Sequence, residues 1–452
     1  MIYIQIPGNH TPERSYIIDL LLGEFLGLDY QICINTNIRD YIINVDDGCE
    51  LIIKDHFFKY YGDGLSYLNK ENIPNMVEFA SNQFIVNADI PVLYGNNQFE
   101  IYTNKIVCGI DIFASSFFML TRWEEFVCKN LDHFGRFPIF ESLSYKYNFL
   151  DRPIVNEYVE MLWNMLKHLK TKQRRQERKF ELVLTHDVDS VKYWRNIMFF
   201  LKIIAGDLLR TNPTLLAHNI NNYISAKLGL KNDPYDTFDF LMDISDAINT
   251  KSSFFIMACK PTAFDCGYSV FGKNCLSLIK KINERGHFIG IHSSFFAYND
   301  PIIWKNEYRM LSKYSPQIIA SGRQHCLRFE VPITWQIMDD NKMEWDSTLG
   351  YANKEGFRCG VCYDFSVFNI LTRQKLKLKE KPLVAMDVSF LYQGLSPKSL
   401  KQKILCLMDR VKKYQGTFVL LWHNSSFNVK GWEKYSGIYE NLLKEGVEVK
   451  HE

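Results

Sequence analysis

Two aspartates separated by one apolar residue stand at the end of an apolar stretch in the segment ELVLTHDVDS, residues 181–190. Side chains alternate along a strand, so Asp187 and Asp189 face one side and Val188 faces the other. Two such carboxylates can bind a metal ion or transfer protons, whereas a purely structural interpretation makes Asp189 and Ser190 the cap of a following helix. We favour the functional interpretation, because the carboxyl ends of parallel strands are where α/β proteins place their active sites.

Polar residues end three further apolar segments. His292 ends the strand-like part of GHFIGIHSS and is a candidate metal ligand, while His287 is expected to pack at the start of that strand. His423 follows TFVLLW; a lone histidine there is usually a satisfied core residue, but a third polar strand end favours a site. Arg323 and His325 have the same spacing as the two aspartates and can therefore face one side together.

The segments that carry these residues belong to a regular alternation of short apolar runs with helical patterns. The expected strands are ELVLTH, SSFFIM, FIGIHS, CLRFEVP, GFRCGVC, LVAMDVSF and TFVLLWHN. Strands that alternate with helices predict an α/β fold with a parallel sheet or barrel.

The first part of the chain has a different pattern. Short runs rich in β-formers, YIINV, LIIKD and QFIVNA, are separated by turn residues, and FASSFFMLTRWEEFV and NEYVEMLWNMLKHL show helical spacing. Residues 170–179, KTKQRRQERK, contain no apolar side chain. We interpret them as a solvated linker rather than a patch for an anionic ligand, and place a domain boundary there.

Length and charge limit the classes of function. A chain of 452 residues with 47% hydrophobic residues is long enough for two domains. With 53 basic and 51 acidic side chains the net charge is +2, so no global field favours nucleic acid or an anionic membrane. The N-terminus shows no secretion signal, which predicts a cytoplasmic protein. Nothing in the sequence indicates an oligomeric state.

The remaining compositional features predict neither a membrane span nor a disulfide framework. The most apolar window, residues 197–209, is interrupted by Lys202 and Asp207 and is shorter than the roughly 20 residues that cross a bilayer. Eleven scattered cysteines favour reduced thiols. Cys359 and Cys362 form a close pair, but a second pair at zinc-ribbon spacing is missing, so we expect these two side chains to pack in a core.

The order of THDVD, SFFI, GHFIGIHSS, an arginine-bearing strand and LLWHN resembles the polysaccharide deacetylases of carbohydrate esterase family 4, the NodB homology domain. The resemblance is greatest to a divergent bacterial branch with an extra N-terminal domain. It implies an α/β fold, a distorted (β/α) barrel over residues 178–452 with a helical insertion at about 191–233. A smaller α+β domain of unknown role, residues 1–172, precedes the barrel. The family also implies a divalent metal, usually zinc, at the carboxyl mouth of the strands.

The resemblance assigns a role to each matching residue. It implies that Asp187 is the general base and that Arg323 orients it. Asp189 and His292 match the acidic and the first histidine ligand of the metal, and His423 matches the general acid.

Two positions depart from the family pattern. The family more often has adjacent aspartates, whereas Val188 separates them here. The second family histidine falls at Phe296, which cannot bind a metal. We predict His325 as the replacement, because it shares a face with Arg323. The alternative is that His325 only hydrogen-bonds the substrate, while water or His423 completes the metal shell.

Other site residues follow from the same resemblance. Asp387 and Asp346 are both candidates for the acid that holds His423, and the sequence leaves the choice open. Substrate binding is assigned to Trp422, Asn424 and Arg358.

These assignments predict a metal-dependent hydrolase that removes an N-acetyl or related acyl group from an amino sugar of a polysaccharide or glycan precursor. An unlinked, nucleotide-linked or lipid-linked sugar inside the cell fits the expected location. A catalytically inactive carbohydrate-binding barrel is one alternative, which Phe296 permits, and a hydrolase of a non-sugar amide is another.

Overall fold

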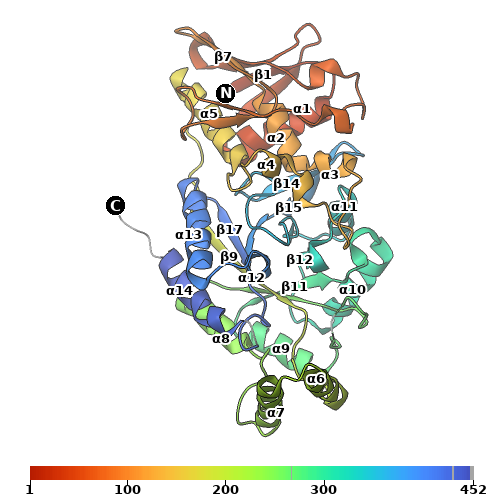
Figure 1. The fold of residues 1–452 in the computed structure, drawn as a ribbon. Helices are drawn as coiled ribbons and strands as arrows, with labels where there is room; N and C mark the ends of the chain where they lie inside the picture. The colour runs from red at the N-terminus through yellow and green to blue at the C-terminus, as the bar shows by residue number, and fades with distance from the viewer. Residues whose placement is uncertain (266, 430–431, 448–452) are drawn as a thin grey trace. The chain divides into compact units, whose positions relative to one another are not determined.

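The structure is a computed structural model that describes residues 1–265, 267–429 and 432–447 (Figure 1). Its contacts divide the chain into two compact units, each made of several segments. The first contains residues 1–181, 327–384 and 409–418, and the second contains 182–326, 385–408 and the described chain from 419 onward. The predicted domains, 1–172 and 178–452, are two continuous ranges, whereas each unit combines several segments. The domain boundaries stay a prediction. Residues 448–452 of the second domain lie outside the described residues.

A six-stranded mixed sheet in the order β2-β1-β3-β4-β8-β7 forms the centre of the first unit. The strands are β1 (Ile2–Ile6), β2 (Tyr30–Ile34), β3 (Tyr41–Val45), β4 (Cys49–Ile53), β7 (Gly95–Ile101) and β8 (Lys105–Ile110). A second, two-stranded sheet pairs β5 (Glu78–Ala80) with β6 (Ile90–Val92). In β3 the alternate residues Tyr41, Ile43 and Val45 are buried, and the residues between them are only partly buried. This alternation is expected for a sheet with one covered face.

The helices of the first unit occupy both regions in which the sequence predicted a helix, and other regions besides. They are α1 (Thr11–Ile18), a π-helical turn (Asp19–Phe25), α2 (Ile112–Thr121), α3 (Trp123–Val127), α4 (Leu143–Lys146), α5 (Ile154–His168) and α11 (Ile333–Asp340). Where the sequence predicted one helix over FASSFFMLTRWEEFV, the chain breaks between α2 and α3. The cause is Arg122, whose φ of 52° lies in the left-handed region that a right-handed helix cannot include.

Three predicted strands are wrong. QFIVNA, residues 83–88, forms turns, and the backbone N–H of Phe84 donates to the Asn82 side chain instead of to a neighbouring strand. CLRFEVP begins in a tight turn in which Cys326 and Leu327 have positive φ. GFRCGVC, residues 356–362, contains no strand, and Gly356 and Gly360 both have positive φ.

A larger sheet has nine strands in the order β14-β15-β13-β12-β11-β10-β9-β17-β16. The first three are β14 (Phe365–Asn369), β15 (Gln374–Glu380) and β13 (Trp345–Asp346). The others are β12 (Ser321–Gln324), β11 (Phe288–Ser293), β10 (Ser253–Ile256), β9 (Glu181–Val188), β17 (Thr417–Leu421) and β16 (Leu383–Met386). The sheet curls, but in the part of the chain that the structure describes no pairing joins β14 to β16. The α/β class is as predicted, and the sheet is a half-barrel rather than a closed barrel.

The strands that lead to the candidate site are parallel and buried. Strands β9, β10, β11 and β12 pair in parallel, and Asp187 stands opposite Phe255 while His292 stands opposite Arg323. Every residue of β10 and β17 is buried, which explains why both read as continuous apolar runs. Gly290 permits the close approach of β11 to β10, because a Cβ there would lie 2.4 Å from the Phe255 ring.

Helices connect and flank these strands. They are α6 (Ile197–Leu209), α7 (Pro213–Lys227), α8 (Phe238–Ala247), α9 (Lys273–Glu284), α10 (Pro301–Tyr314), α12 (Asp387–Tyr392), α13 (Pro397–Lys413) and α14 (Ser436–Val447). The first two lie in the predicted helical insertion. Among the described residues, no helix is both long enough and apolar enough to cross a bilayer.

Candidate metal centre

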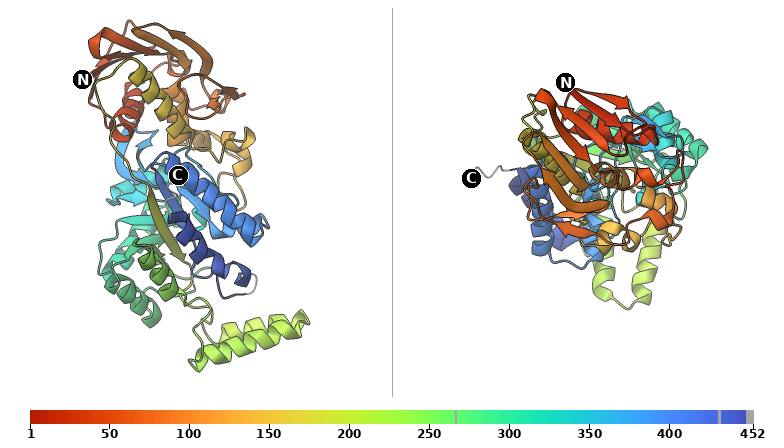
Figure 2. Two further views of the ribbon diagram at one scale, coloured as in Figure 1. Left: turned by 90° about the vertical axis from the view of Figure 1, so that its left-hand side faces the viewer. Right: turned by 90° about the horizontal axis from the view of Figure 1, so that it is seen from above.

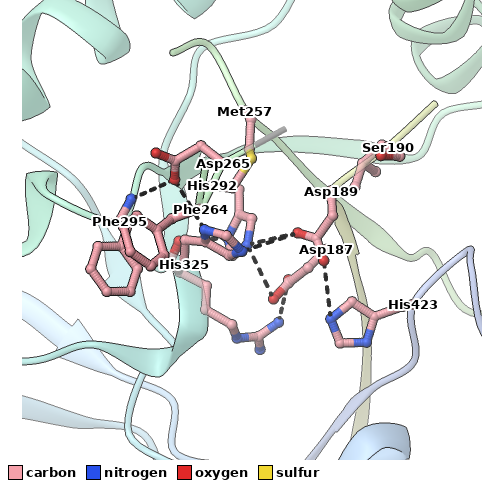
Figure 3. Close-up of polar contacts among 12 residues, drawn as sticks. Asp187, Asp189, Ser190, Met257, Phe264, Asp265, His292, Phe295, His325 and His423 are labelled. Carbon is pink, nitrogen blue, oxygen red and sulfur yellow. Dashed lines mark hydrogen bonds and ion pairs between the residues drawn. The ribbon is translucent and has the colours of Figure 1, made fainter. Parts of the chain in front are cut away.

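The polar strand ends identified in the sequence meet in the second unit (Figure 3). Asp187 lies in β9 and Asp189 follows it directly, while His292 lies in β11. His325 begins the turn that follows β12, and His423 stands two residues beyond β17. Figure 3 shows the Asp189 carboxylate between the His292 and His325 rings on one side and His423 on the other. Parallel strands have their carboxyl ends at one edge of the sheet, which explains why these side chains lie close together.

Asp189, His292 and His325 form a group of possible metal ligands, with ligand atoms within 4.8 Å of one another. The Nε2 atom of His292 lies 3.4 Å from Asp189 Oδ1, and that of His325 lies 3.8 Å from the same oxygen. Ligands bound tetrahedrally at about 2.0–2.2 Å would be about 3.3–3.6 Å apart, so only small movements are needed to bind one ion.

The hydrogen bonds of the two imidazoles aim their other nitrogens at Asp189. His292 Nδ1 donates to the backbone oxygen of Arg323 at 2.9 Å, and His325 Nδ1 donates to Asp265 Oδ1 at 3.1 Å. A carbonyl oxygen only accepts, so the neutral His292 ring has its proton on Nδ1 and its lone pair on Nε2. Such a fixed tautomer is the usual arrangement of a metal-binding histidine.

Asp265, which fixes His325, was not among the site residues predicted from the sequence. Its Oδ1 accepts from the Phe295 backbone N–H at 2.7 Å, and its Oδ2 accepts from the Thr262 hydroxyl at 2.7 Å. Burial raises the pKa of this carboxyl, but the bonds from His325 and Thr262 outweigh it, so the pKa is lowered. The available signal was its place in the loop after β10, at the same edge of the sheet.

The carboxylate of Asp189 supplies an observation in favour of a cation. Its Oδ1 atom is buried and receives no hydrogen bond from any residue that the structure describes. A buried carboxylate oxygen without a donor is costly, and a metal ion among the three ligands would satisfy it. The residues present therefore fit a divalent metal.

Asp187 forms a buried ion pair with Arg323. Arg323 Nη1 donates to Asp187 Oδ1 at 2.8 Å and to the Thr185 hydroxyl at 3.0 Å. Burial raises the pKa of Asp187, but the charge of Arg323, aided by His292, lowers it overall. Asp187 is thus ionised, and its Oδ2 lies 3.8 Å from His292 Nε2.

His423 contacts Asp387, one of the two acids between which the sequence did not decide. The His423 Nδ1 atom lies 2.8 Å from Asp387 Oδ1, and the His423 backbone N–H donates to Oδ2 at 2.8 Å. Burial lowers the pKa of His423, but the Asp387 charge and hydrogen bond outweigh it and raise the pKa to about 10. Asp346 lies in the first unit, where it accepts a hydrogen bond from Thr348 at 2.7 Å.

The three residues assigned to substrate binding make contacts within the protein. Trp422 is fully buried and its ring packs near Tyr439, at 5.2 Å between centroids. The Asn424 amide is buried and donates to the backbone oxygens of Ser190 and Tyr235. Arg358 lies in the first unit with its guanidinium on Glu125. All three side chains are buried in contacts with other residues of the protein. Their assignment to substrate binding stays a prediction.

The comparisons with known proteins match different parts of the chain. Residues 2–171 match a family of unknown function, DUF7033. The search of curated proteins gave no match.

Solved structures with similar folds cover about 60% of the chain. One from Mycobacterium smegmatis, assigned to the polysaccharide deacetylases, has 13% identity and a TM-score of 0.39, covering 61% of this chain and 86% of the other. A polysaccharide deacetylase from Bacillus cereus has 13% identity and a TM-score of 0.30, covering 61% and 93%. A carbohydrate esterase family 4 pseudoenzyme from Bacillus anthracis has 13% identity and a TM-score of 0.30, and the chain spans 63% of its length. TM-scores below 0.5 establish no function for this chain.

Proposed function

We propose that the second unit is a metal-dependent hydrolase that removes an acetyl or related acyl group from an amino sugar. The observation that carries the proposal is the convergence of three possible metal ligands, Asp189, His292 and His325, between the buried carboxylate of Asp187 and the half-buried imidazole of His423. Hydrolysis of an amide requires these parts: a proton acceptor for water, a proton donor for the amine, and charge stabilisation for the carbonyl oxygen.

Zinc is the ion that the donor set favours. One carboxylate and two imidazoles are common zinc ligands, and three protein ligands leave a position open in a catalytic site. When bound, such an ion lowers the pKa of a coordinated water and polarises a carbonyl oxygen.

Asp187 and His423 divide the proton transfers between them. The ion pair with Arg323 keeps Asp187 ionised, so Asp187 accepts the proton of the attacking water. The Asp387 carboxylate keeps the His423 ring oriented and protonated, with Nε2 3.9 Å from Asp189 Oδ2 and therefore facing the centre. His423 donates a proton to the departing amine, which leaves as a free amino sugar while the acyl group leaves as a carboxylate.

The sugar in the substrate is inferred from the motif order that resembles the polysaccharide deacetylases, and a non-sugar amide stays the alternative. The position of Phe296 favoured a second alternative, an inactive carbohydrate-binding unit. Phe296 is 50% exposed and carries no ligand atom, but His325 supplies a second imidazole at the centre. This placement supports an active hydrolase over the inactive alternative.

Metal analysis together with acetate release tests the proposal. Purified protein should contain about one zinc per chain, and Asp189→Ala and His292→Ala should each lose it. Metal-loaded protein should release acetate from at least one member of a panel of N-acetylated amino sugars. The Asp187→Asn variant is the control, because it should keep the metal and lose the activity. Bound metal in both ligand variants would refute the ligand assignment, and bound metal with no acetate from any sugar would favour a binding protein or another amide.

A further inference from the structure

The helical insertion between Ser190 and Asp233 takes no part in the proposed reaction. Helices α6 and α7 run side by side as a hairpin that projects from the strands of the second unit (Figure 2). The base of the hairpin is fixed beside the centre: Asp233 accepts from the backbone N–H groups of Tyr193 and Trp194, and Arg195 donates to the Ser190 hydroxyl. The insertion is therefore attached next to Asp189.

An apolar face of the hairpin is open to solvent. Five large side chains of α6, from 50% to 87% exposed, recur at helical spacing: Ile197, Met198, Leu201, Leu208 and Leu209. Three more, from 48% to 73% exposed, lie in or just after α7: Ile224, Leu228 and Leu230. An isolated exposed leucine needs no explanation, but a continuous apolar face on one element indicates a binding surface.

This face is not needed to hold the two helices together. Their contact is made by other side chains: Asn219 donates to Asp207 at 2.7 Å, and the rings of Phe200 and Tyr223 stack with centroids 3.9 Å apart. Asp207 and Asn219 are both buried. The exposed apolar side chains are thus available for a partner.

The charge of the insertion identifies the kind of partner. Residues 191–232 contain six lysines and arginines and one acidic residue, Asp207, although the whole chain has a net charge of only +2. Asp207 is buried and pairs with Arg210 at 3.5 Å, whereas Lys202, Lys227 and Lys231 are exposed. An exposed apolar stripe with basic residues around it complements an anionic lipid surface, where long cationic side chains reach the headgroups.

We propose that the α6–α7 hairpin binds to the surface of a bilayer that contains anionic lipid. The apolar side chains of α6 enter the boundary between headgroups and acyl chains, and the lysines and arginines contact lipid phosphates. The hairpin lies on the bilayer and does not cross it: the 13 residues of α6 span about 20 Å, against about 30 Å of hydrocarbon. Because the hairpin is attached beside Asp189, the candidate centre is held at the membrane. If the proposed function holds, the acylated amino sugar is then one presented by a membrane lipid.

Cosedimentation with vesicles tests the proposal. The full-length protein should bind vesicles of phosphatidylglycerol and phosphatidylcholine and bind pure phosphatidylcholine about ten-fold less, and high salt should reduce the difference. The triple variant Met198→Asp, Leu201→Asp, Leu209→Asp should lower binding by about ten-fold or more. Lys202→Glu with Lys227→Glu should remove the preference for anionic vesicles. Ile318→Asp is the matched control, because Ile318 is 89% exposed outside the hairpin, and this variant should bind like the unmodified protein.

Three results would overturn the proposal: no binding of the unmodified protein to anionic vesicles, equal binding by the triple variant, or equal binding to both vesicle types. A dimer that the triple variant converts to monomer, without vesicle binding, would instead assign the face to a second copy of the chain. Circular dichroism and metal content confirm that the variants are folded. Vesicle binding requires neither metal nor substrate, so its failure is distinguishable from failure of the proposed hydrolysis.

Discussion

Each unit contains a cluster of buried charged residues, and the two clusters differ in how their charges are satisfied. In the first unit, Glu125 receives hydrogen bonds from both Arg122 and Arg358, at 2.6 to 2.9 Å. In the second, the Nε2 atoms of two imidazoles face Asp189, whose Oδ1 receives no hydrogen bond from the described residues. A carboxylate paired with guanidinium groups stabilises the fold. Ligand atoms that converge without a hydrogen-bond donor between them form a possible binding site for a cation.

Removal of the carboxylate from the first cluster should have the largest effect. The Glu125→Ala variant leaves Arg358 buried without its carboxylate and leaves Arg122 with Glu124 alone, at 3.5 Å, and breaking a buried pair in this way costs about 3–5 kcal/mol. Denaturant unfolding should show this loss, while metal content of the folded protein stays unchanged. If the free energy of unfolding falls by less than about 1 kcal/mol, the ion pairs of the first cluster contribute little to stability. The distinction between a structural cluster and a metal-binding cluster would then be wrong.

The proton-transfer residues should give the next largest effect. Asp187→Asn and His423→Ala should each lower turnover by about 100-fold or more with the metal still bound, because these residues move protons rather than hold the ion. Steady-state kinetics on an active sugar, together with metal analysis of the same samples, measure both quantities. Normal turnover of either variant contradicts the role given to that residue.

Asp265→Asn should have a smaller effect on the second cluster. The change retains the shape of the side chain but removes the charge that orients His325, and loss of such a partner typically costs 10- to 100-fold in metal affinity, about 1.4–2.7 kcal/mol. Competition with a chelator measures the affinity. His325→Ala should weaken binding at least as much, and unchanged affinity in both variants would leave His325 as a substrate contact.

The smallest effect concerns pH. Burial lowers the pKa of His325, but its hydrogen bond to Asp265 and the charge of Asp189 raise it to about 11. At pH 7 the ring of the metal-free protein is protonated, and the metal must displace that proton, so affinity should rise up to about ten-fold per pH unit below this pKa. Calorimetry in two buffers with different ionisation enthalpies should detect proton release, reduced in Asp265→Asn. Equal affinity at pH 6 and pH 8 would contradict the proton displacement.

Apolar periodicity was sufficient to predict the strands that end at the centre. β9, β11 and β17 appear where the sequence placed them, because their continuous apolar runs have no stable position except inside a sheet. The runs at 326–332 and 356–362 looked similar but do not form strands, since positive φ at Cys326 and Gly360 interrupts them. Backbone conformation at a single residue is not visible in apolar periodicity.

The candidate centre was only partly predictable for a related reason. Alternation within one segment brought Asp187 and Asp189 together in the prediction, but contacts between segments needed the structure. The bond of Asp265 to His325 joins residues 60 positions apart, and the choice of Asp387 for His423 depends on a contact across 36 positions. Local spacing carries no information about such pairs, and the resemblance offered no match for Asp265.

The neighbouring positions of β9 and β17 have a consequence for the synthesis of the protein. His186 Nδ1 bonds to the backbone oxygen of Trp422, 236 positions along the chain, and the Trp422 N–H donates to Thr185. At the usual rate of translation, β9 leaves the ribosome about 10–50 s before its partner strand exists. A nascent chain stalled before Thr417 already contains Asp187, His292 and His325, yet one edge of β9 is unpaired and His423 is missing. The centre can therefore be completed only after His423 has been translated, and the early strands depend on protection from aggregation until then.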